Sequence, residues 1–414
     1  MTVTLTPKTL SGSVTPPPSK SQAHRVLIAA ALAQGDSHIH NLAPSQDMIA
    51  TRRCLEELGA GFEEKSDGLL VHGMGANAMS PLRRLALPHL DCGESGSTLR
   101  FLIPVALAVR GGGIFTGQGR LMERPLEPYF EIFKEKGIFY EQRGGALTVQ
   151  GLLTPGQYRL AGNVSSQFFT GLLFALPLLD GPSAIIPTTD LESVDYIAMT
   201  CQAMELFGVR TVATLSLPPQ YHMEGNQTYT PADVTVEADW SQAGFWYAAK
   251  ALGNAVTVEG LDPNSTQGDR VIADHFAILT KPGDVDIDVS GCPDLVPPLA
   301  AMAALRNGRT RIINAGRLRI KESDRLAAVT QVLTALGAHI TEGPDFLDIQ
   351  GKETLAGGAR VDSFNDHRIA MMTAIAATRC EKPVTLTGAE SVKKSYPDFW
   401  QEYERVGGSL VWNT

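Results

Sequence analysis

The chain has 414 residues, of which 43% are hydrophobic and 19% charged, and its formal net charge is −9. This length exceeds one ordinary hydrophobic core, so two domains are predicted. The composition excludes a disordered chain, and the acidic balance argues against a nucleic-acid surface, which is broadly basic. A binding site for anions must therefore come from a local cluster of cations.

The five cysteines are widely spaced and form no C-x-x-C pair. This favours free thiols in a reducing compartment over disulfides or a zinc site. Residues 1–8 contain no apolar core of signal-peptide length, and apolar runs such as 172–179 are too short to span a bilayer. We therefore expect a cytoplasmic protein that is not embedded in a membrane.

Taken in order, the chain repeats one pattern six times. A polar helix start leads into an Ala/Leu-rich helix, a glycine turn, a β-rich run, a second helix ending near a glycine, and two short strands. The repeats open at 19–25, 92–98, 163–167, 239–242, 292–294 and 364–368. At about 55–80 residues they exceed most solenoid repeats, so each is predicted to be a small βαβ-containing unit. Three units per domain are expected, with a boundary in the polar stretch 225–238.

The fifth repeat contains a charged run, residues 317–325, in which an extended segment is expected to lead into a helix. Leu326, Val329, Leu333 and Leu336 follow at the three-and-four spacing of an amphipathic helix. Ser323 or Asp324 is predicted to cap this helix, and the glycine after Leu336 to end it. A solvated, salt-bridged helix entrance would explain the run by itself, and only its neighbours favour a function.

Other repeats also begin with cations or small polar donors. Lys20 and Arg25 follow a proline-rich entry, residues 93–97 form a glycine-rich helix start, and the Asn365–Arg368 run combines a cap with two basic side chains. Each has a structural explanation of its own as a cap or a surface ion pair. No Walker loop, dinucleotide fingerprint, metal-ligand spacing or cysteine nucleophile motif is present. Together the helix starts suit anionic substrates that react by proton transfer.

Seven runs, in order, resemble those of the 5-enolpyruvylshikimate-3-phosphate synthase family: PSKSQAHR, GESGSTLRFL, GRLMERP, NVSSQF, LRIKESDRL, FNDHRIAM and KKSYPDF. The resemblance covers almost the whole chain. It implies an α/β (α+β) fold of two domains, each built of three repeated βαβαββ units, with the active site in the interdomain cleft. One domain would comprise residues 1–20 and 236–414, and the other residues 21–235.

The activity implied by the resemblance is transfer of the enolpyruvyl group of phosphoenolpyruvate to the 5-hydroxyl of shikimate 3-phosphate, with release of phosphate. This reaction belongs to the shikimate pathway of aromatic amino-acid biosynthesis. No metal or organic cofactor is implied. The expected partners are the two small substrates alone, bound by a monomer whose domains close around them.

The resemblance also implies residue roles. Asp294 would be the base at the 5-hydroxyl, while Glu322 and Lys20 would manage the proton at C3 of phosphoenolpyruvate. Phosphoenolpyruvate would be bound by Lys20, Gly96, Arg124, Gln167, Arg325, His367, Arg368 and Lys394. Shikimate 3-phosphate would be bound by Lys20, Ser21, Arg25, Ser97, Ser165, Ser166, Gln167, Ser193, Tyr196, Asp294 and Lys321.

Three residues depart from the commonest pattern of the family. Glu94 stands where an asparagine is usual, and unless it is paired or points away it should weaken anion binding. Arg317 replaces a frequent asparagine, which leaves its contact with substrate open. Phe101 replaces a frequent proline, so sensitivity to the herbicide that competes with phosphoenolpyruvate is not inferred.

Two alternatives remain at this point. UDP-N-acetylglucosamine enolpyruvyl transferase has a similar fold and the same donor, but that family usually carries a cysteine in the loop that is 117–124 here, where this chain has none. A non-enzymatic ring such as a sliding clamp would require a basic inner surface, which the net charge of −9 disfavours.

Overall fold

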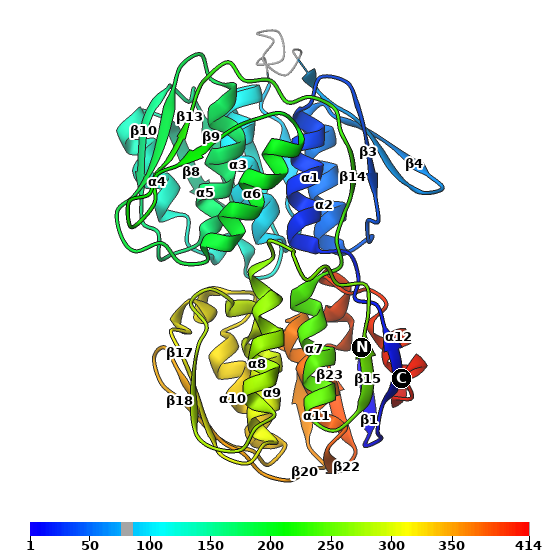
Figure 1. The fold of residues 1–414 in the computed structure, drawn as a ribbon. Coiled ribbons are helices and arrows are strands. Elements are labelled where there is room, and N and C mark those ends of the chain that lie inside the picture. Colours follow the sequence, from blue (N-terminus) through cyan, green and yellow to red (C-terminus); the bar gives the residue numbers. More distant parts are fainter. Residues whose placement is uncertain (76–85, 414) are drawn as a thin grey trace. The chain divides into compact units, whose positions relative to one another are not determined.

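The computed structural model describes residues 1–75 and 86–413, which form two compact units (Figure 1). Unit 1 comprises residues 1–19 and 238–414, and unit 2 comprises residues 20–237. The N-terminal strand therefore belongs with the second half of the chain. No helix in the described ranges is long and apolar enough to cross a membrane.

Unit 2 contains three four-stranded sheets of the same topology. In spatial order, each sheet begins with two parallel strands. An antiparallel hairpin follows, and the hairpin strand that comes later in the sequence pairs with the second of the two parallel strands. In spatial order the strands are β14 (Asp233–Thr235), β3 (Asp36–His40), β5 (Gly68–His72), β4 (Gly61–Lys65); β6 (His89–Asp91), β7 (Gly112–Thr116), β9 (Ala146–Gln150), β8 (Phe139–Arg143); and β10 (Gly156–Leu160), β11 (Ser183–Pro187), β13 (Tyr221–Met223), β12 (Val212–Ala213). Strand β14 comes from the end of the unit and completes the first sheet.

Unit 1 contains two more four-stranded sheets with the same strand directions and adds two strand pairs, but in its second sheet the two antiparallel strands come from opposite ends of the chain. Its strands are β16 (Val285–Asp288), β17 (Arg309–Ile313), β19 (Leu347–Gln350), β18 (His339–Glu342); β21 (Arg360–Asp362), β23 (Val384–Thr387), β1 (Thr2–Thr6), β24 (Ser409–Asn413); β15 (Ala255–Val258) with β2 (Ser11–Val14); and β20 (Leu355–Gly357) with β22 (Cys380–Lys382). The predicted βαβαββ repeat is thus confirmed, although the fourth copy is reduced to the parallel β15–β2 pair with its helices.

Two helices accompany each repeat. The α-helices are α1 (Lys20–Leu32), α2 (Gln46–Leu58), α3 (Gly96–Arg110), α4 (Glu127–Lys136), α5 (Ser166–Ala175), α6 (Val194–Leu206), α7 (Trp240–Ala251), α8 (Ile272–Leu279), α9 (Val296–Ala304), α10 (Arg325–Ala335), α11 (His367–Ala377) and α12 (Phe399–Arg405). Short 3₁₀ helices are η3 (Leu121–Glu123), η4 (Leu176–Leu178), η5 (Gly268–Val271), η6 (Pro293–Leu295), η7 (Gly316–Ile320) and η8 (Ala389–Lys394).

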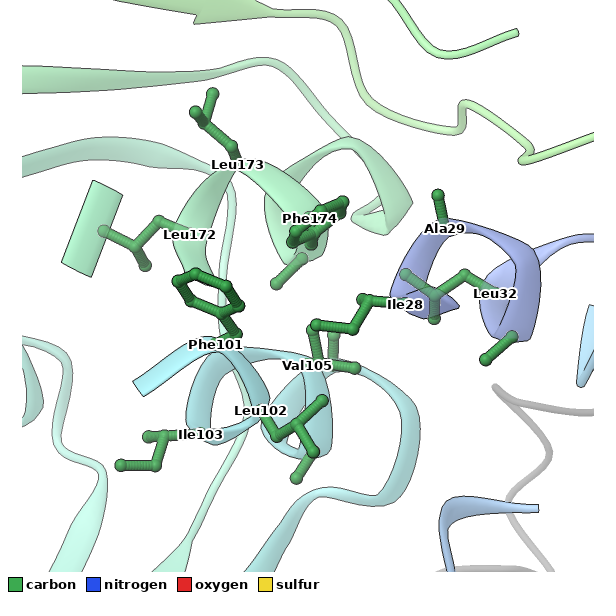
Figure 2. Packing of buried hydrophobic residues seen from close by; sticks show 14 of the residues in the cluster. Ile28, Ala29, Leu32, Phe101, Leu102, Ile103, Val105, Leu172, Leu173 and Phe174 are labelled. Atoms are coloured by element: carbon green, nitrogen blue, oxygen red, sulfur yellow. The ribbon is translucent and has the colours of Figure 1, made fainter. Parts of the chain in front are cut away.

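The first helix of each complete repeat lies in the core of its unit. α1, α3 and α5 are apolar on nearly all sides, as a helix enclosed by other elements requires. Figure 2 shows Ile28 of α1, Val105 of α3 and Phe174 of α5 in the same packed cluster. Because such a core admits few polar groups, the polar residues of these helices are concentrated in their first turns.

The predicted helix after the charged run is α10, and Asp324 is its N-cap, accepting a hydrogen bond from the Ala327 N–H at 3.1 Å. Gly337 adopts the left-handed conformation with φ of +96°. The expectation of an extended segment before this helix is wrong, since η7 occupies that position. The tight 3₁₀ turn buries Leu318 completely while the flanking arginines stay partly exposed.

Candidate functional site

The first turns of α1, α3, α5 and α6 form a polar group in unit 2, which we call the helix-start cluster. Its central side chain is Arg25, which is only 2% exposed and has no carboxylate partner in the described residues. Its Nε donates to Thr200 Oγ1 at 2.8 Å, and its terminal nitrogens donate to the carbonyl oxygens of Ser21 at 2.6 Å and Tyr196 at 2.9 Å. Burial lowers the pKa of Arg25 to about 10. A buried cation bonded only to neutral oxygens favours the approach of an anion.

A second buried guanidinium, Arg100 on α3, orients one of the predicted ligands. Arg100 donates to Gln167 Oε1 at 2.8 Å and to the Pro125 carbonyl at 3.0 Å. The Gln167 amide nitrogen in turn donates to Ser97 Oγ at 3.0 Å. Burial, and then the charge of Arg124, lowers the pKa of Arg100 to about 9. Arg100 was not predicted as a site residue, although its position one helical turn after Ser97 was a sequence signal for it.

Lys20 and Gly96 begin α1 and α3, and each has a defined neighbour. Lys20 Nζ lies 2.8 Å from Asp47 Oδ2, and the two side chains are 16% and 9% exposed. Arg124 lies directly against Gly96, where an added Cβ would come within 2.5 Å of Nη1. A side chain at position 96 would therefore require the Arg124 guanidinium to move. Asp47, in the first turn of α2, was not predicted because its contact with Lys20 depends on how α1 and α2 pack.

The predicted serines occupy helix starts. Ser165 is the N-cap of α5, with Oγ accepting from the Gln167 N–H at 3.3 Å, and Ser166 begins the helix. Ser193 precedes α6 in the left-handed conformation with φ of +54°, and the ring of Tyr196 lies 5.8 Å from Arg25 Cζ. Unit 2 therefore brings the neutral donors and cations predicted for it to neighbouring helix starts.

Unit 1 contains a second group, the carboxylate–cation cluster, which consists of Asp294, Lys321, Glu322, Arg325, Asp366, His367, Arg368 and Lys394. Arg325 is 2% exposed and donates through Nε to Asp366 Oδ2 at 2.7 Å and through Nη1 to Asp294 Oδ1 at 2.9 Å. Burial lowers the pKa of Arg325, but the charges of Asp366, Asp294 and Glu322 outweigh this effect and raise it. Arg325 is therefore fixed as a cation. Asp366, the N-cap of α11, was missed as a site residue although it lies in the FNDHRIAM run.

Glu322 is the acidic group placed among these cations. Its Oε2 accepts from His367 Nδ1 at 2.9 Å and lies 4.0 Å from Lys394 Nζ, while Oε1 lies 3.7 Å from Arg325. Burial by itself raises the pKa of the Glu322 carboxyl, but the charge and hydrogen bond of His367 and the charges of Arg325 and Lys394 hold it well below its usual range. Glu322 is therefore a carboxylate that stays ionised because of its cationic neighbours.

Asp294 connects three of the predicted cations. Arg368 donates to Asp294 Oδ2 at 3.1 Å and to Ser241 Oγ at 3.0 Å, while Lys321 Nζ lies 3.8 Å from Asp294 Oδ1. Four basic side chains thus surround three carboxylates, before any charge on His367. An incoming carboxylate or phosphate would have to compete with Asp294 for the two arginines. Ser241, at the start of α7, was not predicted.

The group Glu322, Asp366 and His367 has ligand atoms close enough together for a metal ion. Arg325 and Lys394 already occupy the space around these carboxylates, as the distances above show. These two cations already neutralise the carboxylate oxygens, and a metal ion would have to displace both Arg325 and Lys394. The residues present therefore fit an anion-binding role better than a metal centre.

The departures noted in the sequence have defined positions. A Cβ at Gly119 would lie 2.8 Å from Glu94 Oε2, so the Glu94 carboxylate packs against that loop. Arg317 donates to the Ser290 carbonyl oxygen within unit 1. Phe101 is buried in α3, with its ring 5.2 Å from Arg25 Cζ.

The sequence and the fold are both shared with known proteins. The sequence model of EPSP synthase (3-phosphoshikimate 1-carboxyvinyltransferase) matches residues 5–403. The chain belongs to this family. It is a transferase of the shikimate pathway that acts by enolpyruvyl transfer, and the UDP-N-acetylglucosamine alternative is not favoured.

Curated relatives support this membership over the full length of the chain. The 3-phosphoshikimate 1-carboxyvinyltransferase of Clostridium kluyveri is 45% identical over 425 residues, which cover 99% of this chain and 98% of that protein. The protein of the same name from Clostridium perfringens strain 13 is 44% identical, with 99% of each covered.

Solved structures show the same fold. EPSP synthase from Acinetobacter baumannii matches with a TM-score of 0.79 at 24% identity, covering 99% of this chain and 100% of that one. The enolpyruvyl transferase NikO from Streptomyces tendae matches with a TM-score of 0.74 at 16% identity, covering 99% and 98%. The predicted fold class is therefore confirmed.

Proposed function

We propose that the helix-start cluster and the carboxylate–cation cluster bind phosphoenolpyruvate and shikimate 3-phosphate in the roles implied by the sequence. Phosphoenolpyruvate is assigned to Lys20, Gly96, Arg124, Gln167, Arg325, His367, Arg368 and Lys394. The phosphoshikimate is assigned to Lys20, Ser21, Arg25, Ser97, Ser165, Ser166, Gln167, Ser193, Tyr196, Asp294 and Lys321. Each charge-assisted hydrogen bond of this kind contributes about 1.5–3 kcal/mol.

The observation that carries the proposal is the environment of Glu322. Its pKa is held low by the charge and hydrogen bond of His367, and then by the charges of Arg325 and Lys394. When an anionic substrate binds Arg325 and Lys394, their part of this effect is neutralised and the pKa of Glu322 rises. A carboxyl whose pKa rises on binding can take up a proton and deliver it to C3, so binding itself prepares the acid.

The proton balance follows from these roles. Asp294 accepts the proton of the 5-hydroxyl as its oxygen attacks C2, and Glu322, with Lys20, supplies a proton to C3. In the second step the carbon–oxygen bond to phosphate breaks, and a proton returns from the C3 methyl group to Glu322. Asp294 passes the hydroxyl proton to the departing phosphate, and Glu322 has regained the proton that it supplied, so both carboxyl groups end in their starting states.

The test is phosphate release from phosphoenolpyruvate with and without shikimate 3-phosphate. We expect release that depends on the phosphoshikimate and is lost in Glu322→Ala and Lys20→Met. Lys394→Met should lower turnover, whereas Lys393→Met, which removes an exposed neighbouring lysine, is the matched control. Full activity in both Glu322→Ala and Lys20→Met would refute the assigned roles, and release only with UDP-N-acetylglucosamine would change the acceptor.

We further propose that units 1 and 2 are the two domains and that the protein is a cytoplasmic monomer. The five cysteines are all free thiols in the structure, which fits a reducing compartment. Light scattering coupled to size-exclusion chromatography tests the monomer directly, since a dimer would double the measured mass.

A further inference from the structure

Strand β3 carries two histidines on the outer face of its sheet. Side chains two residues apart on a strand share a face, so His38 and His40 point outward while Ser37 and Ile39 are buried on the other side. The two imidazole rings have their centroids 4.1 Å apart. A His-x-His pair on a strand therefore presents two nitrogen ligands side by side.

Two carboxylates from neighbouring elements converge on these rings. Asp233 lies on β14, which runs beside β3, and its Oδ1 is 3.0 Å from His40 Nε2 (Figure 1). Asp67, in the turn between β4 and β5, has Oδ1 3.3 Å from His38 Nε2 and Oδ2 3.8 Å from His40 Nδ1. One ligand atom from each of His38, His40 and Asp233 lies within 4.8 Å of the others.

Both Nε2 atoms lie close to carboxylate oxygens, which cannot donate a hydrogen bond when they are ionised. His40 Nδ1 lies 3.0 Å from the Asp67 backbone carbonyl, an acceptor, so this nitrogen carries a hydrogen. In the neutral ring Nε2 then has a lone pair facing Asp233, a contact that is favourable only with a proton or a cation between the atoms. His38 Nε2 is buried and makes no hydrogen bond to any described residue. A bound cation would satisfy both nitrogens.

We propose that His38, His40, Asp67 and Asp233 bind a divalent transition-metal ion, with Zn²⁺ the best match. Two imidazoles with carboxylates suit zinc, nickel or copper, whereas magnesium and calcium prefer oxygen ligands alone. His38, His40 and Asp233 bring three ligand atoms together, and the Asp67 carboxylate would complete the tetrahedral coordination of zinc by turning toward the ion. The carbonyl bonded to His40 Nδ1 resembles the outer-shell partner that orients metal-bound histidines. The carboxylates of Asp67 and Asp233 are 63% and 74% exposed, so both can turn toward an ion.

The consequence is structural. Within its sheet β14 has three residues and pairs only with β3. Asp233 brings this edge strand into the proposed site, and Asp67 brings in the β4–β5 turn. A metal ion would therefore join three segments that are distant in sequence and secure the strand that precedes the passage into unit 1. This role is separate from the enolpyruvyl-transfer residues, none of which belongs to the proposed site.

The experiment is calorimetric titration of the metal-free full-length protein with ZnCl₂, supported by thermal unfolding. We expect one equivalent of Zn²⁺ to bind the wild type and raise its unfolding temperature. His38→Ala and His40→Ala should each weaken binding at least about tenfold, and the double variant should show neither binding nor the shift. His222→Ala, which removes an exposed strand histidine from another sheet, is the matched control.

Circular dichroism verifies that each variant is folded. Absorption bands of Co²⁺ in a tetrahedral field provide a second readout, present in the wild type and the control and absent in the double variant. The proposal is overturned if the wild type binds no Zn²⁺, or if the double variant binds it as tightly as the wild type. Equal binding of Mg²⁺ would likewise contradict the assigned ligand chemistry.

Discussion

Replacing Asp366 by asparagine should destabilise unit 1 far more than the same change at Asp324. Both aspartates are N-caps in unit 1, and both pair with an arginine. Asparagine caps helices as well as aspartate, so the loss of the cap contributes little in either variant. What differs is burial: the side chains of Asp366 and Arg325 are 0% and 2% exposed, whereas those of Asp324 and Arg319 are 37% and 31% exposed.

The magnitudes follow from this difference. Removing one partner of a buried ion pair leaves an uncompensated charge and costs about 3–5 kcal/mol. Arg325 keeps Asp294 at 2.9 Å, so we expect the lower end, about 3 kcal/mol, for Asp366→Asn. A partly exposed pair contributes about 0–1 kcal/mol, so Asp324→Asn should cost less than about 1 kcal/mol.

Urea unfolding followed by tryptophan fluorescence measures this directly. All four tryptophans lie at 240, 246, 400 and 412, within unit 1, so the signal reports that unit. Linear extrapolation gives the free energy of unfolding in water for each variant. A difference between the two variants of less than about 1 kcal/mol would refute the argument that burial of the Asp366–Arg325 pair determines its contribution.

Three further predictions follow from the same contacts. In Arg100→Lys, the lysine cannot donate to both the Gln167 amide oxygen and the Pro125 carbonyl oxygen. We therefore expect kcat/KM for phosphoenolpyruvate to fall about tenfold, with unchanged circular dichroism. An unaltered kcat/KM would contradict the positioning role of Arg100. The folded-state pKa of Glu322 is depressed, so the contribution of this carboxylate to stability is present above the unfolded pKa of about 4.3 and is lost as pH falls through the lower folded value. The difference in unfolding free energy between wild type and Glu322→Gln should therefore shrink on acidification. A difference that does not change with pH would oppose this linkage. Binding of both substrates should lower the radius of gyration measured by X-ray scattering, and equal values with and without ligands would exclude domain closure.

Local sequence patterns predicted much of this protein. The spacing of apolar residues predicted α10, the short polar residue before it predicted the cap at Asp324, and the repeated helix starts predicted the βαβ units. These features depend on residues within one or two turns of each other, so they can be read without knowing the fold. The ordered motifs added the family and its activity.

The long-range pairings were decided only by the tertiary structure. Arg325 meets Asp366, 41 residues away, and Arg100 meets Gln167, 67 residues away, because the repeats bring successive helix starts together. Strand β14 completes the sheet of β3 across almost the whole of unit 2, and so brings Asp233 to His40. No local periodicity encodes such contacts. Pairing partners are selected by how sheets and core helices pack, and packing is a property of the whole unit.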